Sequence, residues 1–363
     1  MGMHRRYPAM ACCLGTSRAQ VATTVRGPSI DSLAAGFAKS VDMPEKSIYQ
    51  KKLCKTATEG QSCVMRRFIA LTALLSPSSA LAVPTPGSVP SPAEIVAKAP
   101  ASAWRDVAPE HLLVMKLADG DRVVIELAPD FAPVHVANIV RLAKAHQWNG
   151  GAITRVQDNY VVQWRVHDEA ASLPKGFVMH PPAEYERPLA GLDYRALGYP
   201  DAYAPQAGFA GGWAVGRDKN LVWPAQCYGM VGVGRDMPPD TGDGRELYVV
   251  NGEAPRQLDR NLAVVGRVLE GMEHLGALTR GTGDLGFYTD ARQTIPIASI
   301  TLASDMAQTV RPVYQVMRID TPSFTAYLDA RAARRDPFFV HPAGGVSLCN
   351  VPLPAREVKQ QGR

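Results

Sequence analysis

Residues 153–163 read Ile-Thr-Arg-Val-Gln-Asp-Asn-Tyr-Val-Val-Gln, a run rich in residues that favour extended backbone. The pair Asp158-Asn159 is typical of a turn or bulge and divides the run. On a strand that begins after this pair, Val161 and Gln163 lie on the same face, because side chains alternate between the two faces of a strand. A turn before that strand would direct Arg155 to the same side. The segment therefore predicts an arginine and a glutamine at one opening of a β structure.

On both sides of this segment, the chain combines short strands with two helical stretches. Leu112–Leu117 and Arg122–Leu127 are β-rich and joined by a turn with Gly120, which predicts a hairpin. Apolar residues recur at helical spacing in residues 134–146. Further strands are expected at Met230–Val233, Glu246–Val250, 263–268 and 297–302, and a second helix at 268–278. This order predicts a mainly β fold, a closed antiparallel barrel capped by two helices.

The order of elements and several motifs resemble the cyclophilin family of peptidyl-prolyl cis–trans isomerases, in a divergent, exported bacterial form. Residues 153–163 are similar to the family pattern Phe-His-Arg-Val-Ile-x-x-Phe-Met-x-Gln. Other matching positions are Gly120, the Asp-x-Ala-Pro motif at 130–133, Asn138, and the blocks 229–234, 246–249 and 258–272. The matches span residues 111 to 305 in family order, which chance rarely produces.

The resemblance implies catalysis of rotation about X–Pro peptide bonds. Amide resonance imposes a barrier of about 18–20 kcal/mol on this rotation. Lowering the barrier needs an apolar pocket for the proline ring and a donor to the prolyl nitrogen, which an arginine can supply. By resemblance, Arg155 is catalytic and Gln163 positions the neighbouring carbonyl. The residues implied to bind substrate are Tyr160, Val161, Tyr248 and Leu258 at the proline pocket, with Gly234, Glu246 and Leu262 around it.

Taken one at a time, these residues also fit structural roles, with Arg155 as a surface charge and the apolar residues as core. Glu246 and Leu262 depart from the family, in which most relatives have glutamine and many have histidine at these positions. Glu246 could pair with Arg155 and occupy the donor, or it could hold the guanidinium in place. The alternative function is a catalytically weak or inactive module that binds proline peptides, and a third is a structural barrel that docks a partner.

The N-terminal part of the chain has the features of a secretory signal. Residues 65–82 open with Met-Arg-Arg, continue with an apolar run too short to span a bilayer, and end in Ala-Leu-Ala. We expect a signal peptide cleaved after Ala82, with residues 1–64 an upstream extension outside the native protein. The alternatives are an organellar transit segment at 1–64 and a buried strand at 68–75. Export would place the protein in the periplasm or outside the cell, without stable membrane insertion.

The charge distribution argues against a nucleic-acid partner. The formal net charge is +5, but 11 of the 39 Lys and Arg and 4 of the 34 Asp and Glu lie in residues 1–82, which leaves 28 basic and 30 acidic residues. The eight histidines show no metal-ligand spacing. We expect no metal and no cofactor, and a monomer whose partners are proline-containing polypeptides.

Residues outside the predicted barrel are assigned from composition. Residues 83–108 are rich in proline and predict an extended linker before a cyclophilin-like domain at 109–305. The extra length between Gln163 and Gly229 predicts ordered surface loops, whose aromatic residues are buried anchors or peptide contacts.

Residues 306–363 form a predicted C-terminal extension. Within it, residues 321–335 have apolar side chains at helical spacing and predict an amphipathic helix that packs on the barrel or binds a protein. Cys227 and Cys349 are the two cysteines after residue 65, and they could form a disulfide or stay unpaired.

Overall fold

The computed structural model describes residues 89–359 of the chain. The predicted upstream extension at 1–64 and signal peptide at 65–82 lie outside the described residues, so both stay predictions. Within residues 89–359, no helix has the length and apolar character needed to cross a membrane.

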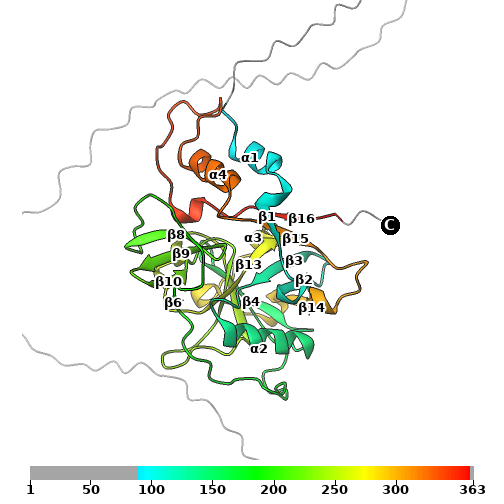
Figure 1. Ribbon diagram of the computed structural model, residues 1–363. Helices are drawn as coiled ribbons and strands as arrows, with labels where there is room; N and C mark the ends of the chain where they lie inside the picture. Colours follow the sequence, from blue (N-terminus) through cyan, green and yellow to red (C-terminus); the bar gives the residue numbers. More distant parts are fainter. Residues whose placement is uncertain (1–88, 360–363) are drawn as a thin grey trace, which may run out of the picture. The chain divides into compact units, whose positions relative to one another are not determined.

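Eight antiparallel strands close into a barrel, which confirms the predicted fold class (Figure 1). In chain order they are β2 (Leu112–Leu117), β3 (Arg122–Leu127), β4 (Ala152–Val156), β5 (Val161–Arg165), β11 (Met230–Val233), β12 (Glu246–Val250), β13 (Val264–Glu270) and β14 (Ile295–Leu302). Around the barrel the order is β11-β12-β5-β4-β14-β2-β3-β13. Strands that are distant in sequence therefore become neighbours.

Two helices predicted from the apolar spacing contact the barrel. Helix α2 (Pro133–Lys144) packs on β14 and begins with proline, whose fixed φ suits the first helical position. Helix α3 (Met272–Ala277) packs on β3 and is shorter than predicted. Its start is set by Gly271, which has φ 98° and separates the helix from β13, so residues 268–270 belong to the strand.

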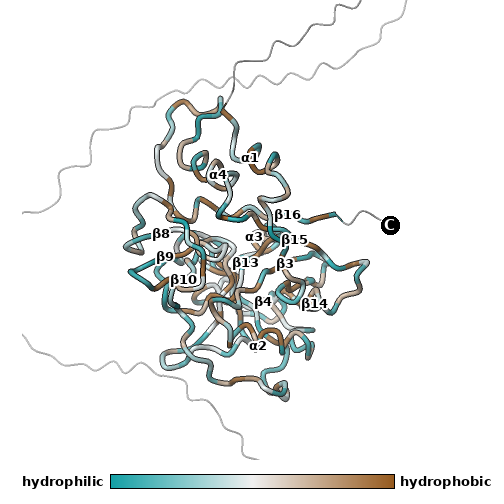
Figure 2. The backbone as a smooth tube through the Cα atoms, in the orientation of Figure 1, coloured by the Kyte–Doolittle hydropathy of each residue, from teal (hydrophilic) through white to brown (hydrophobic). Residues whose placement is uncertain are grey.

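The barrel interior forms the main hydrophobic core. Trp148 and Trp164 are completely buried in it, together with the alternating apolar residues of the strands. Figure 2 shows hydrophobic stretches, in brown, along both α2 and β14, the helix and strand that pack on each other. Trp164 is therefore a core residue of β5 and not an anchor in a loop.

Part of the long segment before Gly229 forms a second sheet, so the prediction of surface loops is wrong for the strands within residues 187–224. The sheet has the order β6-β10-β9-β8-β7. Its strands are β6 (Arg187–Pro188), β7 (Tyr194–Ala196), β8 (Gln206–Ala210), β9 (Trp213–Asp218) and β10 (Leu221–Pro224). Gly211 and Gly212 join β8 to β9 with φ 57° and 81°, as a tight hairpin turn requires. Strands this short give little periodicity in the sequence.

The second sheet packs on the outside of the barrel and forms a second hydrophobic cluster with it. This cluster joins Phe209 and Trp213 of the sheet to Val161 and Tyr248 of the barrel. Trp213 and Trp223 are aromatic residues of this segment, which the sequence leaves as buried anchors or peptide contacts, and both are buried. The insertion is therefore a support for the face of the barrel on which the predicted proline pocket lies.

A third sheet joins the two ends of the described chain. It has the order β1-β15-β16, formed by β1 (Trp104–Asp106), β15 (Tyr314–Met317) and β16 (Ala355–Glu357). The predicted C-terminal helix is confirmed as α4 (Pro322–Ala332), with Phe324 and Leu328 buried in the second cluster. In Figure 1, α4 lies beside α1 (Pro92–Lys98).

The predicted linker at 83–108 is wrong for residues 92–106, which contain α1 and β1. Helix α1 starts with Pro92 at its first position, and Ser91 and Glu94 form a capping box. Trp104 of β1 is buried. Here Pro92 starts a helix. Composition alone does not distinguish a proline at the start of a helix from a proline in an extended linker.

Short 3-10 helices connect several of these elements. They are η1 (Ala101–Ala103), η2 (Pro109–His111), η3 (Ala254–Leu258), η4 (Asp284–Gly286), η5 (Ala291–Gln293), η6 (Ala303–Asp305) and η7 (Leu348–Asn350). Two of them, η3 and η4, lie next to predicted site residues.

Candidate active site

The predicted site residues meet on the outer face of the barrel, across β4, β5 and β12. Arg155 is paired with Gln163 across β4 and β5, and Gln163 is paired with Tyr248 across β5 and β12. Trp164 and Leu247 point into the barrel core, so their neighbours along each strand point outward. The strand register therefore places an arginine, a glutamine and an aromatic ring in one row.

A turn brings Arg155 to this row, as the sequence predicts. Asn159 has φ 49° between β4 and β5, a left-handed conformation that asparagine tolerates better than most residues. Its side-chain oxygen accepts a hydrogen bond from the backbone N–H of Glu253 at 3.1 Å. The turn is thus tied to the segment that leads into η3.

The guanidinium of Arg155 is held by three oxygen acceptors. Its Nε donates to the backbone carbonyl of Leu285 at 2.6 Å, and its Nη1 donates to Oε1 of Gln163 at 3.0 Å. Its Nη2 donates to Oε1 of Gln157. Burial lowers the pKa of Arg155, although the nearby Tyr160 and Glu246 act against this shift. An arginine pKa starts so high that the side chain stays charged at physiological pH.

Gln163 lies between Arg155 and Glu246. Its Oε1 accepts from Arg155, and its Nε2 donates to Oε1 of Glu246 at 2.6 Å. Within the described residues, no ion pair joins Arg155 to Glu246 directly. Of the two roles that the sequence leaves open for Glu246, the geometry fits the one in which the carboxylate holds the guanidinium in place, acting through the glutamine.

Glu246 is a carboxylate in an unfavourable environment. Burial raises its pKa, and the negative charges of Glu169 and Asp236 add to this shift, whereas the hydrogen bond from Gln163 opposes it. Glu246 and Gly234 also line a pocket of about 320 Å³ beside the row of site residues. A side chain at Gly234 would come within 3.0 Å of Glu246 and 3.4 Å of Gln163, so glycine keeps this approach open.

We expect Glu246→Gln to raise kcat/KM about threefold at neutral pH. The new amide oxygen still accepts the hydrogen bond from Gln163, and the substitution removes a negative charge near the guanidinium of Arg155. As the pH falls through the raised pKa of Glu246, the wild-type rate should climb toward that of the variant. The rate of the variant should stay flat over this range. Assays of X–Pro peptide isomerisation from pH 5 to 8 measure both effects.

The surface residue Glu110 provides the control for this prediction, since it is exposed in η2. Glu110→Gln should keep the wild-type pH profile. A Glu246→Gln variant that is slower than wild type, or that keeps the same pH dependence, would show that the charge of Glu246 does not oppose catalysis.

The predicted proline pocket has an apolar floor. Val161 and Tyr248 are buried in the second hydrophobic cluster, and the partly buried Tyr160 and Leu262 pack against the same cluster. Leu258 is partly buried at the end of η3 but is not a member of this cluster. The structure therefore brings together four of the five apolar side chains predicted at or around the pocket.

The ring of Tyr248 is fixed from behind by Gln226, a residue that the sequence did not indicate. The Nε2 of Gln226 donates to the Tyr248 hydroxyl at 2.9 Å, and the hydroxyl donates back to Oε1 at 3.2 Å. Gln226 is completely buried, and burial raises the pKa of Tyr248. A side chain at Gly232 would come within 2.2 Å of the Tyr248 hydroxyl, so only glycine fits beside the ring.

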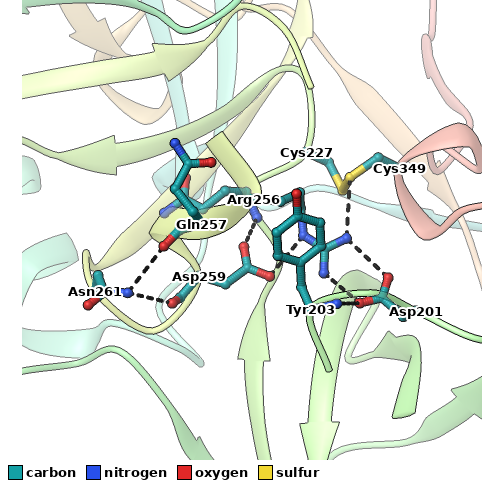
Figure 3. Close-up of polar contacts among 9 residues, drawn as sticks. Asp201, Tyr203, Cys227, Arg256, Gln257, Asp259, Asn261 and Cys349 are labelled. Carbon is teal, nitrogen blue, oxygen red and sulfur yellow. Dashed lines mark hydrogen bonds and ion pairs between the residues drawn. A yellow bond between two sulfur atoms is a disulfide. The ribbon is translucent and has the colours of Figure 1, made fainter. Parts of the chain in front are cut away.

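A buried polar network supports this pocket wall (Figure 3). Arg256 donates to both oxygens of Asp201 at 2.9 and 3.1 Å, and to Asp259 at 2.9 Å. Asp259 also accepts from the backbone N–H of Gln226 at 2.8 Å. Arg256 and the carboxylates are almost completely buried, which makes a full set of partners necessary.

The same network reaches a disulfide bond. Cys227 and Cys349 form a disulfide bond, with their Cα atoms 5.1 Å apart. Of the two possibilities that the sequence leaves open, paired or unpaired cysteines, the structure has the paired one. Arg256 contacts the sulfur of Cys349 at 3.9 Å (Figure 3). The bridge, Arg256, Asp259 and Gln226 form a continuous path to Tyr248.

Another set of side chains holds the insertion over the N-terminus of α2. The carboxylate of Glu184 accepts from the backbone N–H groups of Val134 and His135 at 2.9 and 3.0 Å, and it contacts the His135 ring at 2.7 Å. Asn138, predicted from the family pattern, donates to the carbonyls of Val178 and Asp243. His135 has no sequence pattern that marks it for this role.

Three comparisons with known proteins identify the family of this chain. The family model "Cyclophilin type peptidyl-prolyl cis-trans isomerase/CLD" matches residues 112–302. Proteins named "Probable peptidyl-prolyl cis-trans isomerase" from Brucella suis and Brucella abortus are 28% identical over 174 residues, which cover 48% of this chain and 74% of each relative. The crystal structure of cyclophilin AquaCyp293 from Hirschia baltica is similar with a TM-score of 0.56 and 26% identity, covering 71% of this chain and 95% of that one.

The chain belongs to the cyclophilin-type peptidyl-prolyl cis–trans isomerase family. It is an enzyme of this class, and the resemblance stated from the sequence is confirmed. The roles of the individual site residues stay predictions that the geometry supports. Among residues 89–359, no group of three or more His, Cys, Asp or Glu side chains could hold a metal ion.

Proposed function

We propose that this isomerase acts on proline-containing segments of exported polypeptides and assists their folding outside the cytoplasm. The observation that carries the catalytic part is the row formed by Arg155, Gln163 and Tyr248 on the outer face of the barrel. This row joins a charged donor to an apolar floor. The combination fits a proline ring and the amide that precedes it.

Arg155 is the group assigned to the reacting amide. When the X–Pro bond twists, resonance is lost and the prolyl nitrogen regains a lone pair that can accept a hydrogen bond. A guanidinium has five N–H donors, and three of those on Arg155 are engaged by acceptors in the described residues. The two others belong to Nη1 and Nη2. A donor that bonds the twisted amide better than the planar one accelerates rotation.

Gln163 and the apolar floor provide the remaining interactions. One N–H of the Gln163 amide donates to Glu246, so the second can donate to a substrate carbonyl. Val161 and Tyr248 bury the proline ring against the second hydrophobic cluster, with Tyr160 and Leu262 at its edge. These contacts fix the proline while the preceding residue rotates.

The disulfide bond supports the part of the proposal that concerns export. Bonds of this kind persist in the periplasm and in secreted proteins and are rare in the cytosol. Cys227–Cys349 connects the segment before β11 to the C-terminal extension and touches a buried network. Together with the signal-like residues 65–82, it favours a protein that folds after export.

Three measurements test the proposal. Purified wild-type protein should accelerate isomerisation of a short X–Pro peptide in a protease-coupled assay. When the full chain is expressed in its bacterial host and recovered from outside the cytoplasm, N-terminal sequencing should begin at Val83. Mass spectrometry without reduction should find the peptides of Cys227 and Cys349 linked. Mature protein that begins at residue 1, or that has two free thiols, would contradict export.

A further inference from the structure

The segment from Thr279 to Tyr288 folds back along β4 and contacts the predicted catalytic arginine. The N–H of Gly281 donates to the carbonyl of Val156 at 2.9 Å, and the N–H of Tyr288 donates to the carbonyl of Thr154 at 3.0 Å. Between these two anchors, Phe287 forms a β-bridge with Arg155. The segment is thus attached to the backbone on both sides of the arginine.

The backbone of this segment has an unusual conformation at the contact. Leu285 has φ 55°, which is uncommon for a leucine, and its side chain is 65% exposed. Its carbonyl accepts the hydrogen bond from Nε of Arg155 at 2.6 Å. A large apolar residue with positive φ and little burial persists only where its surroundings impose it. The left-handed backbone at Leu285 directs its carbonyl to Nε of Arg155.

The next residue is a glycine that allows a close approach. A side chain at Gly286 would lie 2.7 Å from Cα of Gln157, the residue whose amide holds Nη2 of Arg155. Gly286 also has φ 80°. Two successive residues with positive φ therefore bring the Leu285 carbonyl to the guanidinium, and the glycine lets the segment pass directly over β4.

Aromatic rings complete the surroundings of the guanidinium. The Cζ atom of Arg155 lies 5.1 Å from the ring centre of Phe287 and 5.4 Å from that of Tyr160. Both distances lie within the range of a cation–π attraction. Phe287 is 38% exposed although it is aromatic, so burial is only part of what it contributes.

We infer that Leu285 and Phe287 are positioning residues for Arg155. The Leu285 carbonyl fixes Nε, the Phe287 ring lies against the guanidinium, and the remaining N–H groups of Nη1 and Nη2 are thereby directed to the substrate. An arginine side chain that is already fixed before the substrate binds loses less conformational freedom when the twisted amide forms than a mobile one would. This inference rests on the proposed catalytic role of Arg155.

The test replaces the ring and follows both turnover and the Nε–H group of Arg155. Phe287→Leu should lower kcat about tenfold with KM within about twofold, because it removes orientation and not substrate contact. In ¹⁵N NMR spectra, hydrogen exchange of the Arg155 Nε–H should become several-fold faster. The resonance is assigned from its absence in Arg155→Lys. Phe287→Tyr, which keeps a ring, should restore both values.

Two further variants sharpen the result. Phe338→Leu makes the same change at an 84% exposed phenylalanine of the C-terminal extension and should alter neither kcat nor Nε–H exchange. Gly286→Ala forces the segment away from Gln157 and should lower kcat at least as much as Phe287→Leu. Thermal unfolding of each variant verifies that the fold is kept.

The outcomes separate this inference from the proposed function. Wild-type kcat and Nε–H exchange in Phe287→Leu would overturn the positioning role while the isomerase stands. A loss of kcat with unchanged Nε–H exchange would also overturn it, since the ring would then act without affecting the arginine. If the wild-type protein has no turnover, the proposed function itself fails.

Discussion

We expect Arg155→Lys to lower kcat/KM for an X–Pro peptide by about a hundredfold or more, the effect of removing a preorganised donor from an active site. Lysine keeps the positive charge but loses the planar fork. Its ammonium has three N–H donors, so bonding the three acceptors that hold Arg155 would leave none for the substrate, whereas the five donors of Arg155 leave two. The protease-coupled assay measures the change, with peptide concentrations chosen to separate kcat from KM.

The matched control is Arg292→Lys, because the Arg292 side chain is 90% exposed and pairs only with Asp290 in the described residues. It should keep wild-type rates. Arg155→Lys should also keep the wild-type thermal unfolding temperature within a few degrees, since Arg155 is only half-buried. Equal turnover in wild type and Arg155→Lys would remove Arg155 from the mechanism.

Removal of the Cys227–Cys349 bridge is expected to have the largest effect on stability. The two cysteines are 122 residues apart, and a crosslink that closes so long a loop restricts the unfolded chain strongly. We expect Cys227→Ala/Cys349→Ala to lower the free energy of unfolding by about 3 kcal/mol. In a domain of this size that corresponds to a fall of about 6–12 °C in Tm. Scanning calorimetry or urea unfolding measures it.

Turnover should fall as well, because the bridge is the outer end of the path that fixes Tyr248. A reducing agent should lower the Tm of the wild type by a similar amount and leave that of the double variant unchanged. This comparison separates the lost bond from the effect of substitution. Equal Tm values for oxidised wild type and the double variant would show that the bond is not a support of the fold.

Local patterns in the sequence predict the barrel well. The β2–β3 hairpin follows from two β-rich runs around Gly120, and α2 and α4 follow from apolar residues at helical spacing. The row of site residues follows from the alternation in β5 and the turn at Asn159. In each case the information lies within about a dozen neighbouring residues.

Contacts between distant residues are what the sequence could not predict. Leu285 is 130 positions from Arg155, and neither its left-handed backbone nor its carbonyl contact has a residue-type signal. Gln226 and Arg256 are polar residues in apolar or mixed surroundings, so their complete burial depends on partners brought in by other segments. The strands of the second sheet contain two to six residues, too few for a reliable period.

The bond between Cys227 and Cys349 has a consequence for the order of events during synthesis. Ribosomes add roughly 5–20 residues per second, so Cys349 is made about 6–24 s after its partner. β16, which completes the third sheet, is made later still. For that interval Cys227 is a thiol without its native partner. Strand β1 lacks its partner only until β15 is made, which happens before Cys349 is added. The chain therefore stays incompletely folded until synthesis has passed Cys349. An incompletely folded chain suits the proposed export, in which the polypeptide crosses a membrane before the disulfide bond forms.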